Sequence, residues 1–201
     1  MLARYGDKIL AVCQANAGMC AALDSGYRRA TGDVISFLDA DDVWLPGKLS
    51  AVVRELERRP AVGMVFHHVR TVDKDGAPVR APWDRGLVAN GDVADSMWLE
   101  CLPWRFRHTS SVSLRRKIAS LAFLLATRLR GHADDLIPGV AALLAQVSFL
   151  LEVLSLYRVH GDNIFAARFL EEYNNARGGQ PAAGPARSAS AKTKRGSRTR
   201  C

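Results

Sequence analysis

Alternating strand-like and helix-like segments in the first third of the chain constrain its fold most. Runs rich in β-branched and aromatic residues predict buried strands, and the segments between them carry apolar residues at helical spacing. The order is strand, helix, strand, helix, strand, at residues 9–15, 19–29, 34–38, 46–59 and 62–69. Strands that alternate with helices form a parallel sheet covered by those helices. We therefore predict an α/β fold with a mixed, mainly parallel, Rossmann-like sheet.

The remainder of the chain is less regular. Helices are predicted at 118–129 and 134–144, and strands at 109–114 and 147–151. The apolar stretch at 137–157 is nearly long enough to cross a bilayer, but a proline and several polar residues interrupt it. We interpret it as a buried helix followed by a buried strand. The chain has 201 residues, 48% of them hydrophobic, which suffices for a core without disulfides or a structural metal.

The excess positive charge is concentrated at the C-terminus. The formal net charge is +8, but residues 177–201 hold seven of the 28 Lys and Arg residues and no acid. The other 21 basic residues nearly balance 20 acidic ones, so we expect no specific nucleic-acid interface. The Gly, Ala, Pro and Ser content of 177–201 predicts a disordered basic tail, after a terminal helical segment at 166–176. Such a tail binds acidic lipid or nucleic acid only through non-specific electrostatics.

Cysteine spacing and the N-terminus bear on the cellular compartment. The four cysteines are Cys13, Cys20, Cys101 and Cys201. They lack the clustering of a zinc site or a disulfide framework, which predicts free thiols in a reducing compartment. Charged residues interrupt the first apolar run, so no signal peptide is predicted. We expect a cytoplasmic location, with peripheral association at the inner face of the membrane through the basic tail.

An acidic cluster follows the predicted strand at 34–38. Asp39, Asp41 and Asp42 lie within four residues of each other, where their charges repel. A divalent cation relieves such repulsion, and hard oxygen ligands suit Mg²⁺ or Mn²⁺. Asp39 and Asp41 point the same way in an extended segment, at the strand end where α/β sheets bind ligands. A solvated acidic turn that caps the next helix is the alternative interpretation.

The sequence around this cluster resembles the family 2 glycosyltransferases. The resemblance is carried by three blocks: Asn16-Ala-Gly18 with Ala30-Thr-Gly32-Asp33 and Ile35 to Leu49; Arg115-Arg116 with Ala133-Asp134-Asp135; and Tyr157-Arg158-Val-His160-Gly161-Asp-Asn163. The blocks keep the order and rough spacing of the family over about residues 5–165. We assign residues 1–165 to one domain of this family.

The resemblance implies a GT-A fold and an inverting, metal-assisted transfer of a sugar from a nucleotide-diphosphate sugar to an acceptor hydroxyl. The acceptor would be a glycan, a lipid-linked molecule or a protein. Asp39 and Asp41 would hold the Mg²⁺ or Mn²⁺ ion, with Asp42 in support. The base that deprotonates the acceptor would be Asp134 or its neighbour Asp135. The residues that would contact the donor are Asn16, Gly18, Asp39, Arg158 and His160.

Residues beside these motifs have structural roles as alternatives. We expect Trp44 and Pro46 to fix the loop after the acidic cluster, and Lys48 to face solvent on its helix. Arg115 and Arg116 could reach phosphate, with one of the two pointing to solvent. His160 has a structural hydrogen bond as its alternative, and Arg158 has an ion pair with a carboxylate at the end of the sheet.

The chain departs from the family at its N-terminus. Family members open with a strand, a helix and a second strand that bind the nucleotide, and we find no counterpart of this βαβ unit. Its absence would expose sheet edges and apolar helix faces. We therefore expect the 201-residue chain alone to bind nucleotide sugar poorly or to be inactive.

Two other functions fit parts of the sequence. Asp39-Ala-Asp41-Asp42-Val43 also matches the signature of haloacid dehalogenase-like phosphatases, in which Asp39 would be the nucleophile and Asp41 the acid/base. That signature belongs on a first strand, whereas here a predicted strand and helix precede it. The other alternative is a degenerate, non-catalytic domain that interacts through its basic tail.

Overall fold

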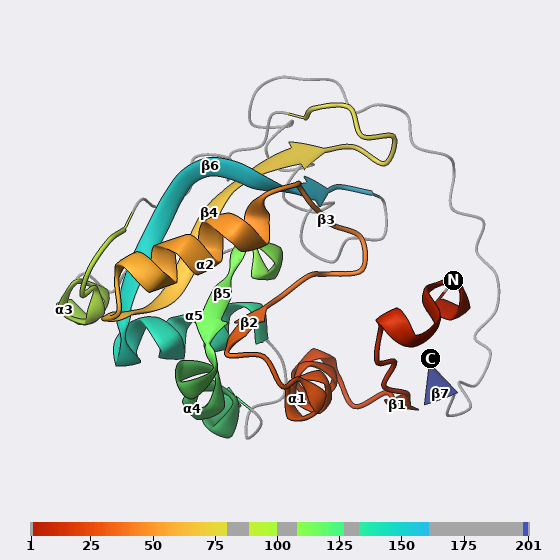
Figure 1. The fold of residues 1–201 in the computed structure, drawn as a ribbon, viewed down its shortest axis with the longest axis horizontal. Helices are drawn as coiled ribbons and strands as arrows, with labels where there is room; N and C mark the ends of the chain where they lie inside the picture. The colour runs from red at the N-terminus through yellow and green to blue at the C-terminus, as the bar shows by residue number, and fades with distance from the viewer. Residues whose placement is uncertain (1, 80–88, 100–107, 127–132, 161–198, 201) are drawn as a thin grey trace, which may run out of the picture.

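The computed structural model describes residues 2–79, 89–99, 108–126, 133–160 and 199–200. A five-stranded sheet with the strand order β2-β5-β4-β6-β3 forms its centre (Figure 1). The strands are β2 (Val34–Ser36), β3 (Val43–Trp44), β4 (Val62–Val72), β5 (Ser113–Arg115) and β6 (Gln146–Arg158). These strands confirm the predicted strands at 34–38 and 62–69, although their ends differ. The stretch at 137–157 is a helix followed by a strand, as predicted.

The directions of the strands confirm the mixed α/β class but correct one detail. β4 and β6 pair in parallel, whereas β2–β5, β4–β5 and β3–β6 are antiparallel. β2, β4 and β6 therefore run in one direction, as predicted, but the sheet is not mainly parallel by its pairings. Two short strands make the antiparallel pairings: β5 lies between β2 and β4, and β3 pairs with the outer edge of β6. β3 was not predicted, because a strand of two residues carries too little periodicity. The strand predicted at 109–114 overlaps β5 only at its end, and Thr109–Ser111 forms a 3-10 helix instead.

Helices cover both faces of this sheet (Figure 1). α2 (Lys48–Arg58) lies on one face, and its apolar side packs with β4 in one buried cluster: Val52, Leu56, Val62 and Val65. α4 (Arg116–Ala126) and α5 (Ala133–Leu144) lie on the other face, over the larger cluster. That cluster is built mainly from apolar residues of alternate strand positions and the two helices, including Ile35, Met64, Phe66, Leu114, Phe123 and Ile137.

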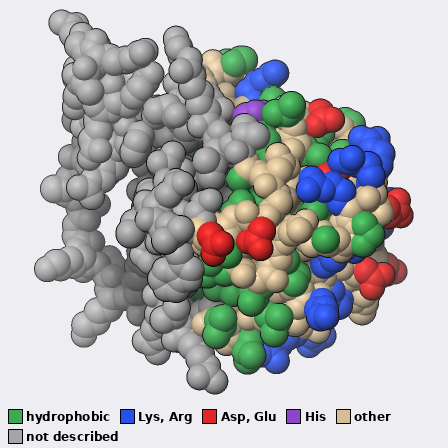
Figure 2. Space-filling model, turned by 90° about the vertical axis from the view of Figure 1, so that its left-hand side faces the viewer, with side chains coloured by type: hydrophobic (Ala, Val, Ile, Leu, Met, Phe, Trp, Pro, Cys, Tyr) green, Lys and Arg blue, Asp and Glu red, His purple; other side chains and the backbone are tan. Residues whose placement is uncertain are grey.

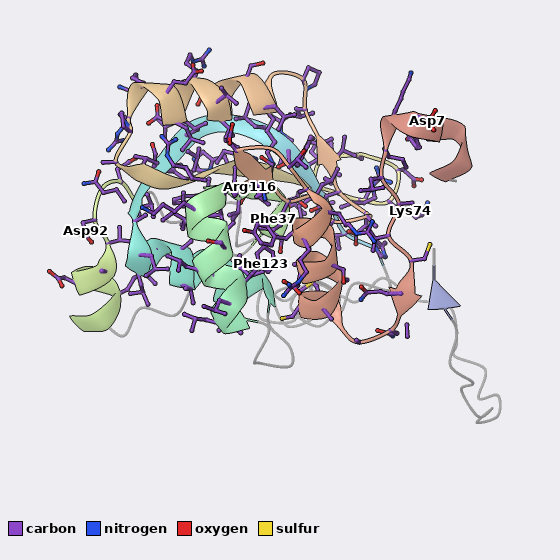
Figure 3. The ribbon with its side chains drawn as sticks, turned by 60° about the horizontal axis from the view of Figure 1, so that its bottom comes forward. Asp7, Phe37, Lys74, Asp92, Arg116 and Phe123 are labelled. Atoms are coloured by element: carbon purple, nitrogen blue, oxygen red, sulfur yellow. The ribbon has the colours of Figure 1, made fainter. Side chains whose placement is uncertain are left out.

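Aromatic contacts attach α1 (Met19–Arg29) to this core. Tyr27 stacks on Phe123 of α4, with 4.7 Å between ring centroids. Phe37, just after β2, packs against the same Phe123 ring at 6.2 Å, and Figure 3 shows the two side chains directed toward each other. The chain is thus anchored in the core immediately before the acidic cluster begins.

The segment before α1 differs from the prediction of a strand at 9–15. Leu2–Lys8 forms the 3-10 helix η1, and Ile9, Leu10 and Val12 are exposed. Only Gln14–Ala15 forms a strand, β1, which pairs antiparallel with β7 (Thr199–Arg200) away from the main sheet. An apolar run becomes a core strand only if a neighbouring strand is available to pair with it, and the described part of the sheet places none there.

The cysteines and the tail are described only in part. Cys20 is buried and is not part of a disulfide, but Cys13 is disulfide-bonded, so the expectation of four free thiols is wrong. The fold can bring two cysteines that are far apart in the sequence close enough to form a disulfide, and their spacing in the sequence does not reveal this. The predicted helical segment at 166–176 lies outside the described residues. So does the predicted disordered tail at 177–201, apart from β7.

Charges of both signs are mixed on the face of the molecule that Figure 2 shows. Basic and acidic side chains are interspersed there among apolar ones. None of the helices in the described ranges combines the length and the apolar character that crossing a membrane requires. The smaller α3 (Ala94–Leu99) completes the described helices.

Candidate functional site

The acidic loop, residues 37–42, is folded back on itself between β2 and β3. The N–H of Phe37 donates to the carbonyl of Val112 at 3.2 Å, and the N–H of Asp42 donates to the carbonyl of Asp39 at 3.2 Å. Trp44 then closes the loop, because its indole Nε1–H donates to the carbonyl of Phe37 at 3.2 Å. The predicted role of Trp44 in fixing this loop is confirmed.

Ser110 connects this loop to three other elements. Its hydroxyl oxygen accepts from the N–H of Asp39 at 2.9 Å. Its backbone carbonyl accepts from Lys48 Nζ at 2.6 Å, from Trp44 Nε1 at 3.2 Å and from Ser155 Oγ at 3.3 Å. We call Ser110 with these partners the Ser110 hub. It joins the acidic loop to α2 and β6 through one buried residue of the 3-10 helix η3 (Thr109–Ser111).

Asp42 is the buried anchor of the acidic loop. Its Oδ1 accepts from the backbone N–H of Arg158 at the end of β6, at 3.0 Å. Burial raises the pKa of Asp42, and the hydrogen bonds from Ser110 and Arg158 partly oppose that rise. Because its carboxylate is directed into the protein and already accepts these bonds, Asp42 holds the loop to β6 rather than facing a ligand.

Asp41 and His160 form a partly exposed pair beside this anchor. His160 Nε2 lies 3.0 Å from Asp41 Oδ2, and the two side chains retain 30% and 36% of their exposure. The pair joins the first and last blocks of the family resemblance, which are more than a hundred residues apart in the chain. Asp39 is half-buried in the same loop. The structure thus brings together two of the predicted site residues, Asp41 and His160, and Asp39 lies two residues before Asp41 in the same loop.

Lys48 does not face solvent as predicted. It lies in the first turn of α2 and is 1% exposed, with Nζ on the Ser110 carbonyl and 4.1 Å from the centroid of the Trp44 ring. Burial lowers the pKa of Lys48 from 10.5 to about 7, and attraction to Asp42 offsets only part of this effect. The expectation failed because a lysine on the polar side of a helical pattern can still turn inward when a buried carbonyl is available.

The predicted phosphate-binding arginines have structural partners. Arg115 Nε donates to the carbonyl of Val62 at 2.7 Å, and its guanidinium also bonds the carbonyl of Leu56 at the end of α2. Arg116 Nε donates to the carbonyl of Gly32 at 2.6 Å. Both side chains therefore fix the start of α4 to neighbouring chain segments.

Asn16 and Gly18 precede α1. The side-chain oxygen of Asn16 accepts from the N–H of Gly18 at 3.2 Å, and Gly18 has a φ of 89°, a conformation that favours glycine. Both residues are exposed at the N-terminal end of the helix. A helix N-terminus presents unpaired N–H groups, which is compatible with the predicted contact to an anionic donor.

Asp134 and Asp135 lie in the first turn of α5, as predicted. Only their backbone is described, so their side-chain positions remain a prediction. One turn further on, the buried Ile137 belongs to the same core cluster as Phe37. The start of α5 and the start of the acidic loop are therefore anchored in one core.

The described residues contain no group of three or more His, Cys, Asp and Glu side chains arranged to hold a metal ion. The donor set near Asp41 is chemically suited to a metal that takes its other ligands from a substrate. Mg²⁺ commonly binds proteins through one or two carboxylates and completes its shell with phosphate oxygens and water. Asp39 and Asp41 fit that pattern, whereas Asp42 does not because its carboxylate is occupied.

The fold and the site define an α/β domain with a carboxylate-bearing loop at the end of a strand, the arrangement in which such sheets bind ligands. The model of the glycosyl transferase family 2 matches residues 2–119, more than half of the chain. The chain belongs to glycosyl transferase family 2. The match contains Asp39–Val43, so the phosphatase interpretation of that motif is rejected.

Relatives and solved structures agree with this assignment. An uncharacterized glycosyltransferase of Nostoc sp. is 35% identical over 158 residues, which cover 78% of this chain and 49% of that relative. An uncharacterized protein of Mycobacterium bovis is 26% identical over 166 residues, covering 79% of this chain and 44% of the relative. The chain thus spans about half the length of these relatives.

The fold is similar to that of Staphylococcus aureus TarS. A crystal structure of TarS residues 1–349 in complex with UDP-GlcNAc matches with a TM-score of 0.57 and 14% identity, covering 81% of this chain and 46% of that one. This similarity confirms the predicted GT-A-like fold.

Proposed function

We propose that this chain supplies the part of an inverting glycosyltransferase that holds the diphosphate of a nucleotide-sugar donor. The observation that carries the proposal is the contact of Asp41 with His160, which joins the loop after β2 to the end of β6. Family membership and the UDP-GlcNAc bound to TarS support a nucleotide sugar as the donor class. Inversion rests on the resemblance to the family.

A divalent metal, Mg²⁺ or Mn²⁺, is part of this proposal. Asp39 and Asp41 would hold it, with His160 beside them, and it would neutralise the charge that develops on the departing diphosphate. The role of the protein is to orient the carboxylates. Asp42 ties the acidic loop to β6, and the Ser110 hydroxyl fixes the backbone at Asp39. The backbone N–H of Arg158 donates to Asp42 and so helps to hold the acidic loop. We also propose that the side chain of Arg158 contacts the donor.

The proposed base is Asp134, with Asp135 as the rival. Transfer with inversion needs one carboxylate to accept the proton of the acceptor hydroxyl as that oxygen attacks the sugar. Both residues open α5, where the positive end of the helix dipole favours the ionised carboxylate. Asp134→Asn and Asp135→Asn separate the two, because only the variant that lacks the base should lose transfer while donor binding is kept.

The acceptor, which we expect to be a glycan, a lipid-linked molecule or a protein, is not defined by the described residues. Peripheral association with a membrane surface through the basic residues of 177–201, on the cytoplasmic side, is the corresponding proposal for location. A non-catalytic domain with a basic interaction tail is the competing function, and it predicts no metal-dependent nucleotide binding.

Calorimetric titration with UDP and with pyrophosphate, each with and without Mn²⁺, tests the proposal. We expect pyrophosphate to bind in the presence of Mn²⁺, with the binding lost in Asp41→Asn and kept in the control Asp75→Asn, and we expect UDP to bind only weakly, in line with the weak nucleotide-sugar binding expected from the sequence. Asp75 is an exposed carboxylate in the turn after β4 and is not part of the acidic loop. Equal affinities with and without Mn²⁺, or an Asp41→Asn variant that binds like the unmodified chain, would show that the site does not hold a diphosphate.

A further inference from the structure

The acidic loop has few contacts of its own to hold its shape. It contains no helix or strand, and its one internal backbone hydrogen bond among those described joins Asp42 to Asp39. Among the described residues, five hydrogen bonds from outside the loop fix the rest: one each on the N–H of Phe37, the carbonyl of Phe37, the N–H of Asp39, the carboxylate of Asp41 and the carboxylate of Asp42. The one on the N–H of Asp39 is accepted by the hydroxyl of Ser110.

The Ser110 hydroxyl holds the first residue of the Asp-x-Asp-Asp segment, because it accepts from the N–H of Asp39. The last residue of the segment, Asp42, is held by the backbone N–H of Arg158. Asp41, the carboxylate that faces His160, lies between these two attachment points. The hydroxyl therefore supplies one of the two attachments that limit the backbone freedom of Asp41.

The Ser110 carbonyl fixes the position of that hydroxyl in turn. It accepts from three side chains, Lys48, Trp44 and Ser155, which come from α2, β3 and β6. All three donors are directed at one buried oxygen, and Ser110 itself is 1% exposed. A buried network with every member paired is rigid, and its geometry is specific.

We propose that Ser110 is a positioning residue that sets the orientation of Asp39 and Asp41 for the diphosphate of the donor, a role that rests on the function proposed above. The residue does not touch the ligand. Its hydroxyl and carbonyl fix the acidic loop relative to α2 and β6, so the carboxylates are pre-organised before the donor and the metal arrive. Pre-organisation increases affinity because less ordering is needed on binding.

The variant Ser110→Ala removes the hydroxyl that accepts from the N–H of Asp39, and Ser110→Thr retains a hydroxyl. Ser111→Ala is the matched control, because Ser111 is a buried serine of the same 3-10 helix whose hydroxyl donates to the carbonyl of His108 at 2.7 Å, outside the acidic loop. Trp44→Phe is a second probe, which keeps a ring and removes the Nε1–H that bonds Phe37 and Ser110. It keeps the proposal testable if Ser110→Ala does not fold.

Two measurements on the full chain are needed. Amide hydrogen exchange without any ligand should show faster exchange at Asp39 in Ser110→Ala, by about tenfold as expected for one lost hydrogen bond, with recovery in Ser110→Thr and no change in Ser111→Ala. The affinity for Mn²⁺ with UDP should fall by a similar factor in Ser110→Ala, while its melting temperature stays within the range of Ser111→Ala. Trp44→Phe should weaken Mn²⁺–UDP binding in the same direction.

The results separate this proposal from the function it rests on. If the unmodified chain binds neither pyrophosphate nor UDP in the presence of Mn²⁺, the proposed function fails, and hydrogen exchange alone still decides whether Ser110 orders the loop. If the chain binds but Ser110→Ala binds equally well, or if Ser110→Ala and Ser111→Ala show the same exchange at Asp39, the positioning role is overturned.

Discussion

The buried Lys48 should make the free energy of unfolding of this chain rise with pH. A variant that lacks the amine should lose this contribution. Its pKa of about 7, against 10.5 in an exposed lysine, corresponds to about 5 kcal/mol of free energy that burial costs the protonated form. Below about pH 7 both the folded and the unfolded chain bind the proton, and the full cost is present. Between about pH 7 and 10.5 the unfolded chain binds more protons, so stability rises with pH.

Lys48→Met removes this cost and keeps the length of the side chain. It also removes the hydrogen bond to the Ser110 carbonyl, which we expect to cost about 1–2 kcal/mol, since Trp44 and Ser155 still donate to that oxygen. The variant should therefore be more stable than the unmodified chain at pH 6, by about 3 kcal/mol, and less stable at pH 10, by about 1 kcal/mol.

Urea unfolding of both proteins at intervals from pH 6 to pH 10 measures this difference. Other titrating groups are common to both proteins and cancel in the comparison. Lys117→Met, an exposed lysine of α4, serves as the matched control and should show a difference that does not change with pH. A Lys48→Met difference that keeps one sign and one size across this range would refute the reasoning, because it would mean that burial does not disfavour the charged amine.

Three further outcomes follow from the core. His67 is 3% exposed, and burial lowers its pKa to about 4. Unfolding therefore takes up a proton between about pH 4 and 6.5, and the chain loses about 3 kcal/mol of stability as the pH drops through that range. Urea titrations of His67→Leu should show a much smaller loss. Gly63→Ala would place a methyl group 2.8 Å from Ile118 Cγ1 and should destabilise the chain by about 1–3 kcal/mol in thermal unfolding. Gly26→Ala meets open space inside α1 and should instead stabilise it by about 0.5–1 kcal/mol; equal melting temperatures for the two glycine variants would contradict the packing.

Local sequence patterns were sufficient where one element could be recognised by itself. The helix predicted at 19–29 has the observed bounds of α1, and the patterns around 46–59 and 134–144 differ from α2 and α5 by only one or two residues at each end. Each has strong apolar periodicity and a Gly or Pro near an end, so neighbours were not needed to define it. The strand after α5 was predicted for the same reason, although it extends to Arg158.

Long-range pairing explains what the sequence did not reveal. β3 was not predicted, because it forms only where β6 offers it a backbone partner, and the strand predicted at 109–114 is displaced to Ser113–Arg115, where β2 and β4 pair with it. The apolar run at 9–12 is exposed because the described sheet offers it no partner. At the site, the aspartates and His160 were found from residue type and order. Ser110 was missed, because its role depends on a backbone carbonyl that every residue possesses and on three donors from distant segments.

The pairing of β4 with β6 also determines where evolution can change the length of this chain. His67 pairs with Leu150 and His68 with Val153, so Leu151 and Glu152 bulge from the strand and are exposed. Deleting this dipeptide would preserve the alternation of side chains on both sides, because strand faces repeat every two residues. Insertions and deletions among homologues should therefore collect at 151–152 and spare the segment from 153 onward, whose register carries Ser155 and Arg158 to the acidic loop.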